Sequence, residues 1–253
     1  MSPSDREGPL VISIGEPQIE PSPEEPLEFR ISSPMVHIPI VHNLSPSVLA
    51  GFCRKAALVA GRDIGQAVEL FAKDGSYFSR YLLPHCTKLT GIDIEPAFRR
   101  AFEGIGRNAE FRCGDSHQLL DDSRWQPDGG FSLVSIDNPL GVFGSSSQYC
   151  EHFDILEKAL GSASGEGAMI FNVVATPYDY DAASNSLWRE RRQRYYGVKA
   201  DHLTVKFMSE FYTGFFRERA VEILDLEFCC REVRDGVPYF YLALLLFNKG
   251  TQC

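Results

Sequence analysis

Four acidic side chains lie at or just after the ends of short apolar segments. In chain order they are Glu69, Asp93, Asp115 and Asp137. A carboxylate accepts hydrogen bonds from ammonium, hydroxyl and amino groups, and its oxygens also bind Mg²⁺. If the apolar segments are neighbouring parallel strands, these carboxylates meet along one edge of a sheet, where they can bind a nucleotide-like ligand.

The segment from Val68 to Tyr77 has the pattern of a strand, a tight turn and the start of a helix. Such a turn directs backbone N–H groups and a helix N-terminus toward a ligand at the carboxyl end of the strand. Glu69 suits the ammonium group of a methionine moiety, and Gly75 lets the backbone approach the ligand closely.

The next three acidic positions suit other parts of such a ligand. Asp93 ends the second apolar segment, where a carboxylate accepts hydrogen bonds from two ribose hydroxyls. Asp115 follows the third segment and can accept from an adenine amino group. The sequence Asp137-Asn138-Pro139-Leu140 ends the fourth segment, at the rim of the expected cleft.

The elements around these motifs alternate between strands and helices. The expected strands are 67–72, 89–94, 110–113, 131–136 and 168–174, and the expected helices are 46–60, 98–105, 116–121, one around 153–160 and 206–219. This alternation predicts βαβ units and a parallel sheet. Two β-rich runs, 221–233 and 237–247, flank Asp235-Gly236 and predict a C-terminal antiparallel hairpin.

The chain divides by composition into three parts. Residues 1–30 are rich in proline and glutamate and are expected to be flexible. Residues 31–61 form a cap segment and a helix, and residues 62–253 form the main domain. An aromatic and basic insertion at about 176–218 is long enough to carry function or helices of its own.

The order of these motifs resembles the class I S-adenosylmethionine-dependent methyltransferases. The spacing of Glu69 and Gly75 is similar to that of small-molecule O-methyltransferases with a Glu-x-Gly-x-x-x-Gly turn. The resemblance covers roughly residues 65–175 and the terminal hairpin. It implies an α/β, Rossmann-like fold with a mostly parallel seven-stranded sheet and a C-terminal antiparallel hairpin.

The resemblance also implies S-adenosylmethionine as the cofactor. Glu69 and Gly75 would hold its methionine part, Asp93 its ribose and Asp115 its adenine. The adjoining residues of the same motifs complete the expected cofactor site: Phe71, Ser76, Ile94, Gly114 and Ser116.

Two residues depart from the glycine pattern of the turn. Phe71 replaces its first glycine, and Lys73 stands where many relatives have another. The Phe71 side chain either points away from the ligand or narrows its pocket.

The pair Asp137 and Asn138 has three interpretations. The two side chains could hold Mg²⁺ with a third ligand such as Asp154 or Asp179, as in metal-dependent O-methyltransferases. They could begin a partial version of the Asp/Asn-Pro-Pro-aromatic turn of amino-methyltransferases, in which Leu140 replaces the second proline and the aromatic is displaced to Phe143. They could also form an ordinary turn.

Candidate catalytic residues are His152 and Asp137. Methyl transfer to oxygen needs a general base, and His152 follows the fourth strand in a loop expected to face the cleft. The alternative is a histidine at a helix start that is exposed to water.

The insertion supplies candidate walls for an acceptor pocket, together with Asn138. They are Tyr178, Tyr180, Trp188, Tyr195 and Tyr196. At helical spacing such aromatics are also typical of a core. The arginines 189, 191, 192 and 194 are expected to form a solvated helix face or to meet an acidic acceptor.

Composition limits the partners and the compartment. The formal net charge of −9 argues against a nucleic-acid partner. The seven cysteines form no Cys-x-x-Cys pair, so we expect a reducing compartment without disulfides or a zinc site. No signal peptide is visible and the longest apolar run, 239–247, is too short for a bilayer, so we expect a cytoplasmic protein. The sequence is compatible with a homo-oligomer.

The leading hypothesis is a methyltransferase acting on a small-molecule acceptor, at oxygen, in the biosynthesis of a specialised metabolite or sugar. A nucleic-acid or protein methyltransferase and a non-catalytic protein that retains the fold are the alternatives. A dinucleotide oxidoreductase is disfavoured, because no Gly-x-Gly-x-x-Gly follows the first strand.

Overall fold

The computed structural model describes residues 41–43, 45–61, 63–76, 78–136, 152–175, 182–198, 203–234 and 237–250. All of them belong to one compact unit, Ile38–Cys253. The expected flexible segment 1–30 lies outside the described residues, so the domain boundaries stay a prediction.

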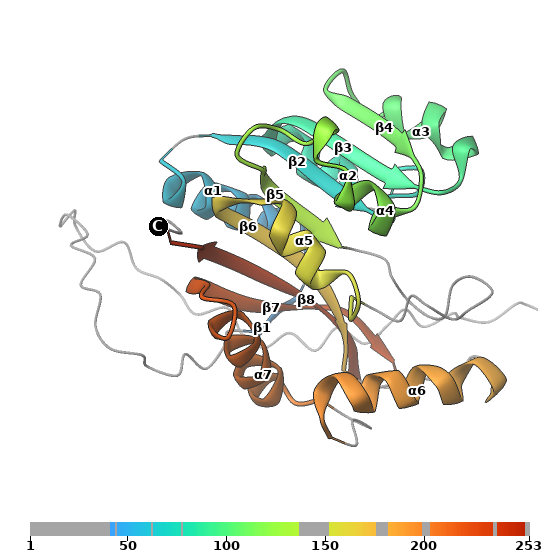
Figure 1. Cartoon of the computed structure of the whole chain (residues 1–253), viewed down its shortest axis with the longest axis vertical. Helices are drawn as coiled ribbons and strands as arrows, with labels where there is room; N and C mark the ends of the chain where they lie inside the picture. The colour runs from blue at the N-terminus through green and yellow to red at the C-terminus, as the bar shows by residue number, and fades with distance from the viewer. Residues whose placement is uncertain are drawn as a thin grey trace, which may run out of the picture. The chain divides into compact units, whose positions relative to one another are not determined.

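The described strands form one sheet of eight strands in the order β1-β7-β8-β6-β5-β2-β3-β4 (Figure 1). Their bounds are β1 Val41–Asn43, β2 Ile64–Leu70, β3 Cys86–Asp93, β4 Ala109–Cys113, β5 Phe131–Ile136, β6 Ala163–Val174, β7 Glu222–Arg234 and β8 Val237–Asn248. Only β8 runs antiparallel to its neighbours, β6 and β7, while the remaining pairs are parallel.

The expected mostly parallel sheet with an antiparallel C-terminal hairpin is therefore confirmed. All seven expected strands form, and the structure adds β1, a three-residue strand paired with the edge strand β7. The sequence could not predict β1, because so short a segment has no periodicity and is ordered by the edge that it joins.

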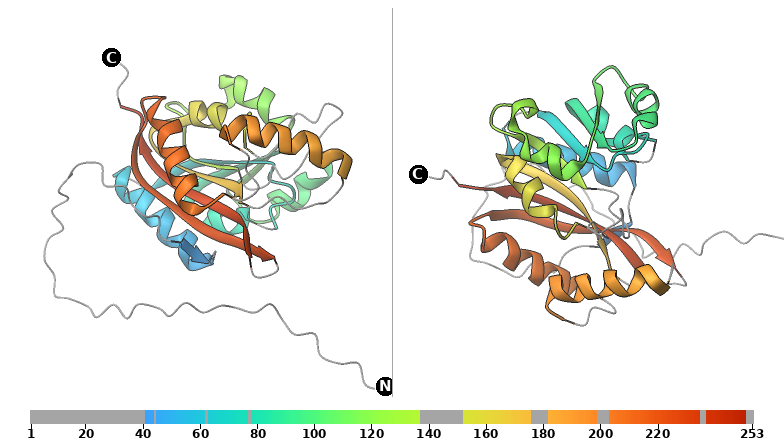
Figure 2. Two further views of the ribbon diagram at one scale, coloured as in Figure 1. Left: turned by 90° about the horizontal axis from the view of Figure 1, so that it is seen from below. Right: turned by 45° about the vertical axis from the view of Figure 1, so that its right-hand side comes forward.

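Helices cover both faces of the sheet (Figures 1 and 2). Their bounds are α1 Pro46–Val59, α2 Ser79–Leu82, α3 Arg99–Glu103, α4 Ser116–Asp121, α5 Leu156–Ser162, α6 Ala182–Tyr196 and α7 Val205–Arg217, with single 3₁₀ turns at Leu83–His85, Pro96–Phe98 and Ser123–Trp125. Helix α1 lies on one face, and α5 and α7 lie on the other (Figure 2).

Helix α1 confirms the expected helix at 46–60. The hydroxyl of Ser45 accepts from the backbone N–H of Val48 at 3.2 Å, and Pro46 occupies the first turn. Gly61, with φ +60°, closes the helix because glycine adopts this left-handed conformation without a steric cost. The apolar stripe of α1 is buried through Leu49, Phe52, Cys53 and Ala56.

The centre of the sheet is apolar on both of its faces. Residues Leu242 to Leu246 of β8 are all buried although successive side chains of a strand point to opposite faces. Because helices cover both sides, the strand needs a continuous apolar run rather than an alternating one. The uninterrupted run at 239–247 in the sequence has this cause.

The insertion at 176–218 forms helices α6 and α7, and it corrects one expectation. Arg192 was expected on a solvated face, yet its side chain is only 1% exposed. It shares the inward face of α6 with Tyr195 and Tyr196, at the spacing of three and four residues that brings side chains together on a helix. Its Nη2 donates to the carbonyl of Ala175 at 3.1 Å.

Candidate functional site

The turn after β2 has an unusual backbone. Phe71 and Lys73 have φ angles of 59° and 50°, and Gly75 has a φ of 71°. All three values lie in the left-handed region, which residues other than glycine rarely occupy. The turn is held by hydrogen bonds from the N–H of Ala72 to Ile92 and from the N–H of Gly75 to Ala72, at 3.0 and 3.1 Å. Phe71 and Lys73 thus adopt the left-handed backbone that glycine favours, although neither is glycine.

Asp93 is fixed at the end of β3. Its Oδ2 accepts from the N–H of Lys73 and its Oδ1 accepts from the N–H of Glu95, both at 3.0 Å. Each carboxylate oxygen has two acceptor positions, so one on each remains for a ligand. Ile94 beside it is 72% exposed and places an apolar side chain at the same edge.

Asp115 lies two residues after the end of β4 and caps helix α4. Its Oδ1 accepts from the N–H of His117 at 2.8 Å. The N–H of Gly114 donates to the carbonyl of Asp93 at 2.9 Å, which joins the two strand ends directly. Ser116 is buried, so it contributes to the packing under this edge.

Glu69 is the deepest of the acids. It lies one residue before the end of β2, opposite Gly91 of β3 and Ser135 of β5, and is 2% exposed. Since β2, β3 and β4 are adjacent and parallel, their carboxyl ends bring Glu69, Asp93 and Asp115 to one edge of the sheet. We call this group of three strand ends the carboxyl edge.

Several expected site residues cannot be located at this edge. Asp137, Asn138 and Tyr178 lie outside the described residues. Trp188 belongs to α6, but its side chain is likewise outside the described part of the chain.

His152 differs from its expected orientation. Its side chain is completely buried, facing neither an open cleft nor water. It packs among the rings of Phe153, Phe171, Tyr195 and Tyr212. Burial lowers the pKa of this histidine to about 3, so it is neutral at physiological pH. Its catalytic role stays a prediction.

The hydrogen-bond partner of His152 was not predicted from the sequence. The hydroxyl of Tyr212, in α7, lies 2.7 Å from Nε2 of His152 and 2.9 Å from the hydroxyl of Tyr196. Helix α7 was expected from its aromatic stripe, but no one-dimensional pattern pairs two residues that are 60 positions apart. The aromatics Tyr195 and Tyr196 thus belong to the packed interior between α6, α7 and the sheet.

A metal site finds no support among the described residues. They contain no group of three His, Cys, Asp or Glu side chains that could hold an ion. Asp154, an expected third ligand, forms an ion pair with Arg191 instead. The proposed ligands Asp137, Asn138 and Asp179 all lie outside the described ranges.

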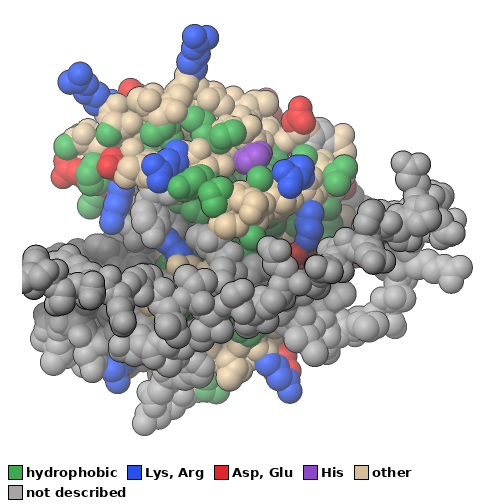
Figure 3. Space-filling view, turned by 180° about the vertical axis from the view of Figure 1, so that it is seen from behind, with side chains coloured by type: hydrophobic (Ala, Val, Ile, Leu, Met, Phe, Trp, Pro, Cys, Tyr) green, Lys and Arg blue, Asp and Glu red, His purple; other side chains and the backbone are tan. Residues whose placement is uncertain are grey.

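Three of the four arginines of α6 do not form an open basic face. Arg191 pairs with Asp154, Arg194 pairs with Glu190 at 2.8 Å, and Arg192 is buried. On the face of the molecule shown in Figure 3, Lys and Arg side chains of the described part are separated by hydrophobic and polar ones. Neither observation supports a surface for nucleic acid.

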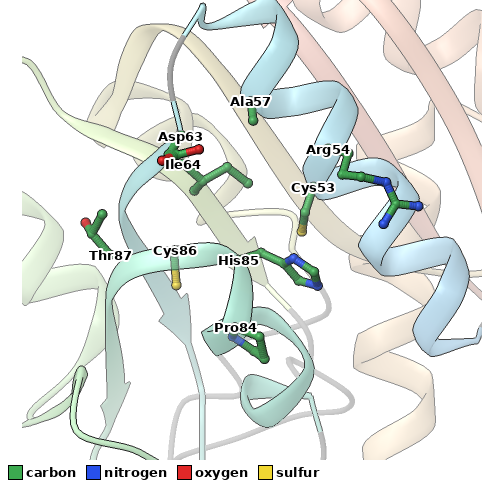
Figure 4. A pocket seen from close by; sticks show the side chains of 9 residues that line it. All are labelled: Cys53, Arg54, Ala57, Asp63, Ile64, Pro84, His85, Cys86 and Thr87. Carbon is green, nitrogen blue, oxygen red and sulfur yellow. The ribbon is translucent and has the colours of Figure 1, made fainter.

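A cavity of about 350 Å³ lies at the opposite edge of the sheet (Figure 4). It is lined by residues of α1, by the start of β2 and by the segment from Pro84 to Thr87. Burial raises the pKa of the thiols of Cys53 and Cys86, which line it, to about 12. Both thiols are therefore protonated and poorly nucleophilic at neutral pH. This cavity lies at the amino ends of β2 and β3 and is separate from the carboxyl edge.

No family model and no curated protein matches the sequence, whereas solved structures share its fold. The plantazolicin methyltransferase BamL, in complex with a triazolic desmethylPZN analog and SAH, superposes with a TM-score of 0.51 at 10% identity, over 81% of this chain and 84% of BamL. The plantazolicin methyltransferase BpumL, with a monoazolic analog and SAH, gives a TM-score of 0.50 at 15% identity, over 79% of this chain and 82% of BpumL. The N-methyltransferase NodS from Bradyrhizobium japonicum WM9 gives 0.47 at 18% identity, over 79% and 84%.

Among the described helices, none is long and apolar enough to cross a membrane. The strand order, the antiparallel β8 and the likeness to BamL and BpumL show that this chain has the fold of the class I methyltransferases.

Proposed function

We propose that this protein is an S-adenosylmethionine-dependent methyltransferase that acts on a small-molecule acceptor. The observation that supports this most is the carboxyl edge, where Glu69, Asp93 and Asp115 end or nearly end three consecutive parallel strands. In open α/β sheets, ligands bind outside the carboxyl ends of the strands.

The residues of this edge fit the cofactor. The Asp93 carboxylate is oriented by two backbone N–H groups and keeps acceptor positions for the ribose hydroxyls. The exposed Ile94 offers an apolar contact for the adenine ring, and Asp115 an acceptor for its amino group. Phe71 is half-buried and packs against the hydrophobic core, which favours a ring turned away from the ligand.

When bound, S-adenosylmethionine supplies an electrophilic methyl group on a sulfonium. The protein's part is to hold donor and acceptor in line and to exclude water. Glu69, buried beside the turn, would hold the ammonium group. Gly75, Ser76 and Gly114 stay our proposed cofactor contacts next to the strand ends, and Phe71 and Ser116, whose side chains pack inward, are proposed to contact the cofactor through their backbone.

For the acceptor we propose an oxygen atom of a modest-sized organic molecule in a specialised pathway. The net charge of −9 and the paired arginines of α6 argue against a polyanionic partner. The structures of BamL and BpumL contain desmethylPZN analogs together with SAH, which is compatible with an organic acceptor. Asn138, Tyr178 and Trp188 remain our candidates for its pocket.

Of the two catalytic candidates, we propose Asp137 as the group at the reacting atoms. His152 is completely buried and its Nε2 contacts the hydroxyl of Tyr212, so it is better suited to positioning the insertion. Mg²⁺ at Asp137 and Asn138 and a cytoplasmic location are retained as proposals.

Isothermal titration with S-adenosylmethionine and its demethylated product tests the proposal. We expect micromolar binding by the wild type and at least a tenfold loss in Asp93→Ala, as expected for a charged hydrogen bond. Asp128→Ala, which removes an exposed carboxylate away from the edge, should bind like the wild type.

Absence of binding by a folded wild type would overturn the proposal and favour a non-catalytic protein with this fold. Binding would justify screening hydroxylated acceptors with and without Mg²⁺, together with amine, nucleic-acid and protein acceptors.

A further inference from the structure

We propose that the ammonium group of Lys73 binds the carboxylate of the amino-acid part of S-adenosylmethionine. This inference rests on the proposed function and deepens it. It assigns a ligand contact to a residue that departs from the glycine pattern of the turn.

The first observation is the backbone of Lys73. Its φ of 50° lies in the left-handed region, where a side chain is disfavoured. Residues that keep such a conformation are held by their surroundings and cluster at functional sites. Phe71, with φ 59°, also stands at a position that favours glycine, and the packing of its ring against the core explains why it has a side chain there. Packing does not explain Lys73, because its side chain is exposed.

The second observation is the position of Lys73 beside the proposed ribose ligand. Its backbone N–H donates to Oδ2 of Asp93 at 3.0 Å. The root of the lysine side chain is therefore fixed at the carboxyl edge, between the end of β2 and the end of β3. A lysine carries its charge on a flexible four-carbon stem, so the ammonium can follow a ligand at this edge.

The third observation is charge complementarity. An α-amino acid carries an ammonium and a carboxylate on the same carbon atom. The turn has a carboxylate before it, at Glu69, and an ammonium within it, at Lys73. A pair of opposite charges at one turn matches both charges of the ligand, whereas Glu69 alone would match only one.

The neighbouring acid does not consume this ammonium in the structure. Asp74 accepts from the hydroxyl and the N–H of Ser76, at 2.6 and 3.0 Å, and these two bonds are the main cause of its lowered pKa, while the charge of Lys73 is the smallest contribution. Within the described part of the chain, the ion pairs do not include Lys73. The exposed ammonium is thus available to an anionic group that arrives with the ligand.

The test compares two ligands that differ in one group. S-adenosylmethionine has the carboxylate, and decarboxylated S-adenosylmethionine lacks it but keeps the ammonium, ribose and adenine. Titrations would use the full-length wild type, Lys73→Met and Lys73→Arg. Lys206→Met is the matched control, since Lys206 is an exposed lysine at the start of α7, an element outside the carboxyl edge.

We expect Lys73→Met to bind S-adenosylmethionine about tenfold more weakly and the decarboxylated ligand within twofold of the wild type. The wild type should bind decarboxylated S-adenosylmethionine about tenfold more weakly than S-adenosylmethionine. The loss of affinity from the lysine and the loss from the ligand carboxylate should not add, because both remove the same contact. Lys73→Arg should restore most of the affinity.

Equal losses for both ligands in Lys73→Met, or no loss for either, would overturn the assignment while leaving the proposed function intact. Lys73→Gly keeps the test valid if the methionine variant misfolds, because glycine suits the φ of 50°. A folded wild type that binds neither ligand would overturn the proposed function itself.

Discussion

Nε2 of His152 lies 2.7 Å from the hydroxyl oxygen of Tyr212, and both side chains are completely buried. The Tyr212 hydroxyl also lies 2.9 Å from that of Tyr196. This chain of polar contacts joins the turn before α5 to α6 and α7. It fixes the two inserted helices relative to that turn in a way that apolar packing alone does not specify.

Replacing Tyr212 with Phe should destabilise the protein by about 2 kcal/mol, because two buried polar groups lose a partner. The loss would be measured by urea denaturation at pH 7.5. Tyr81→Phe is the control: its hydroxyl accepts from Arg80 at 3.0 Å in an exposed position, so its removal should change stability by less than about 0.5 kcal/mol. Equal effects of the two changes would contradict a structural role for the buried chain.

Stability should fall in acid because of His152. Burial lowers its pKa to about 3 in the folded protein, whereas an unfolded histidine titrates near about 6.5. Between these two pKa values the unfolded chain binds one more proton than the folded protein. The contribution of His152 to stability is therefore complete above about pH 6.5 and is lost as the pH falls toward about 3. The slope is at most about 1.4 kcal/mol per pH unit.

His152→Gln isolates this effect, because glutamine retains an acceptor for Tyr212 but does not titrate. Unfolding free energies of both proteins would be measured between pH 7.5 and pH 4.5. The variant should lose less stability over this range than the wild type. Parallel curves would show that His152 is not held neutral.

Gly91 should not tolerate a side chain. A Cβ built on it would lie 2.3 Å from two ring carbons of Phe102, so Gly91→Ala must displace a fully buried ring under the carboxyl edge. We expect a loss of about 3 kcal/mol by thermal or urea denaturation. Gly161→Ala, in α5, meets nothing within 4 Å and should be neutral or stabilising by up to about 1 kcal/mol.

Ala220 offers a gain in stability away from the carboxyl edge. It follows helix α7 with a φ of 55°, a conformation that glycine adopts freely. Ala220→Gly should raise the free energy of unfolding by about 1 kcal/mol, with unchanged ligand binding. A lower melting temperature in this variant would show that the left-handed backbone there is not strained.

The sequence by itself determined the order of the elements. Each strand that alternates with helices is coded by a local apolar run, and a helix such as α1 is coded by a local cap and an apolar stripe, with Ser45 and Pro46 at its start. Parallel strands joined by short connections admit few arrangements, so the ends of β2, β3 and β4 had to meet. Glu69, Asp93 and Asp115 were therefore predictable as one group.

The tertiary structure alone decided the environment of individual side chains. Arg192 and His152 are polar residues that were expected near water, and only the packing of α6 and α7 buries them. The partners Tyr212 and His152 are separated by 60 positions, and the left-handed backbone of Phe71 and Lys73 contradicts their local preference. Burial, partner choice and backbone strain depend on contacts between distant parts of the chain, which no local pattern in the sequence encodes.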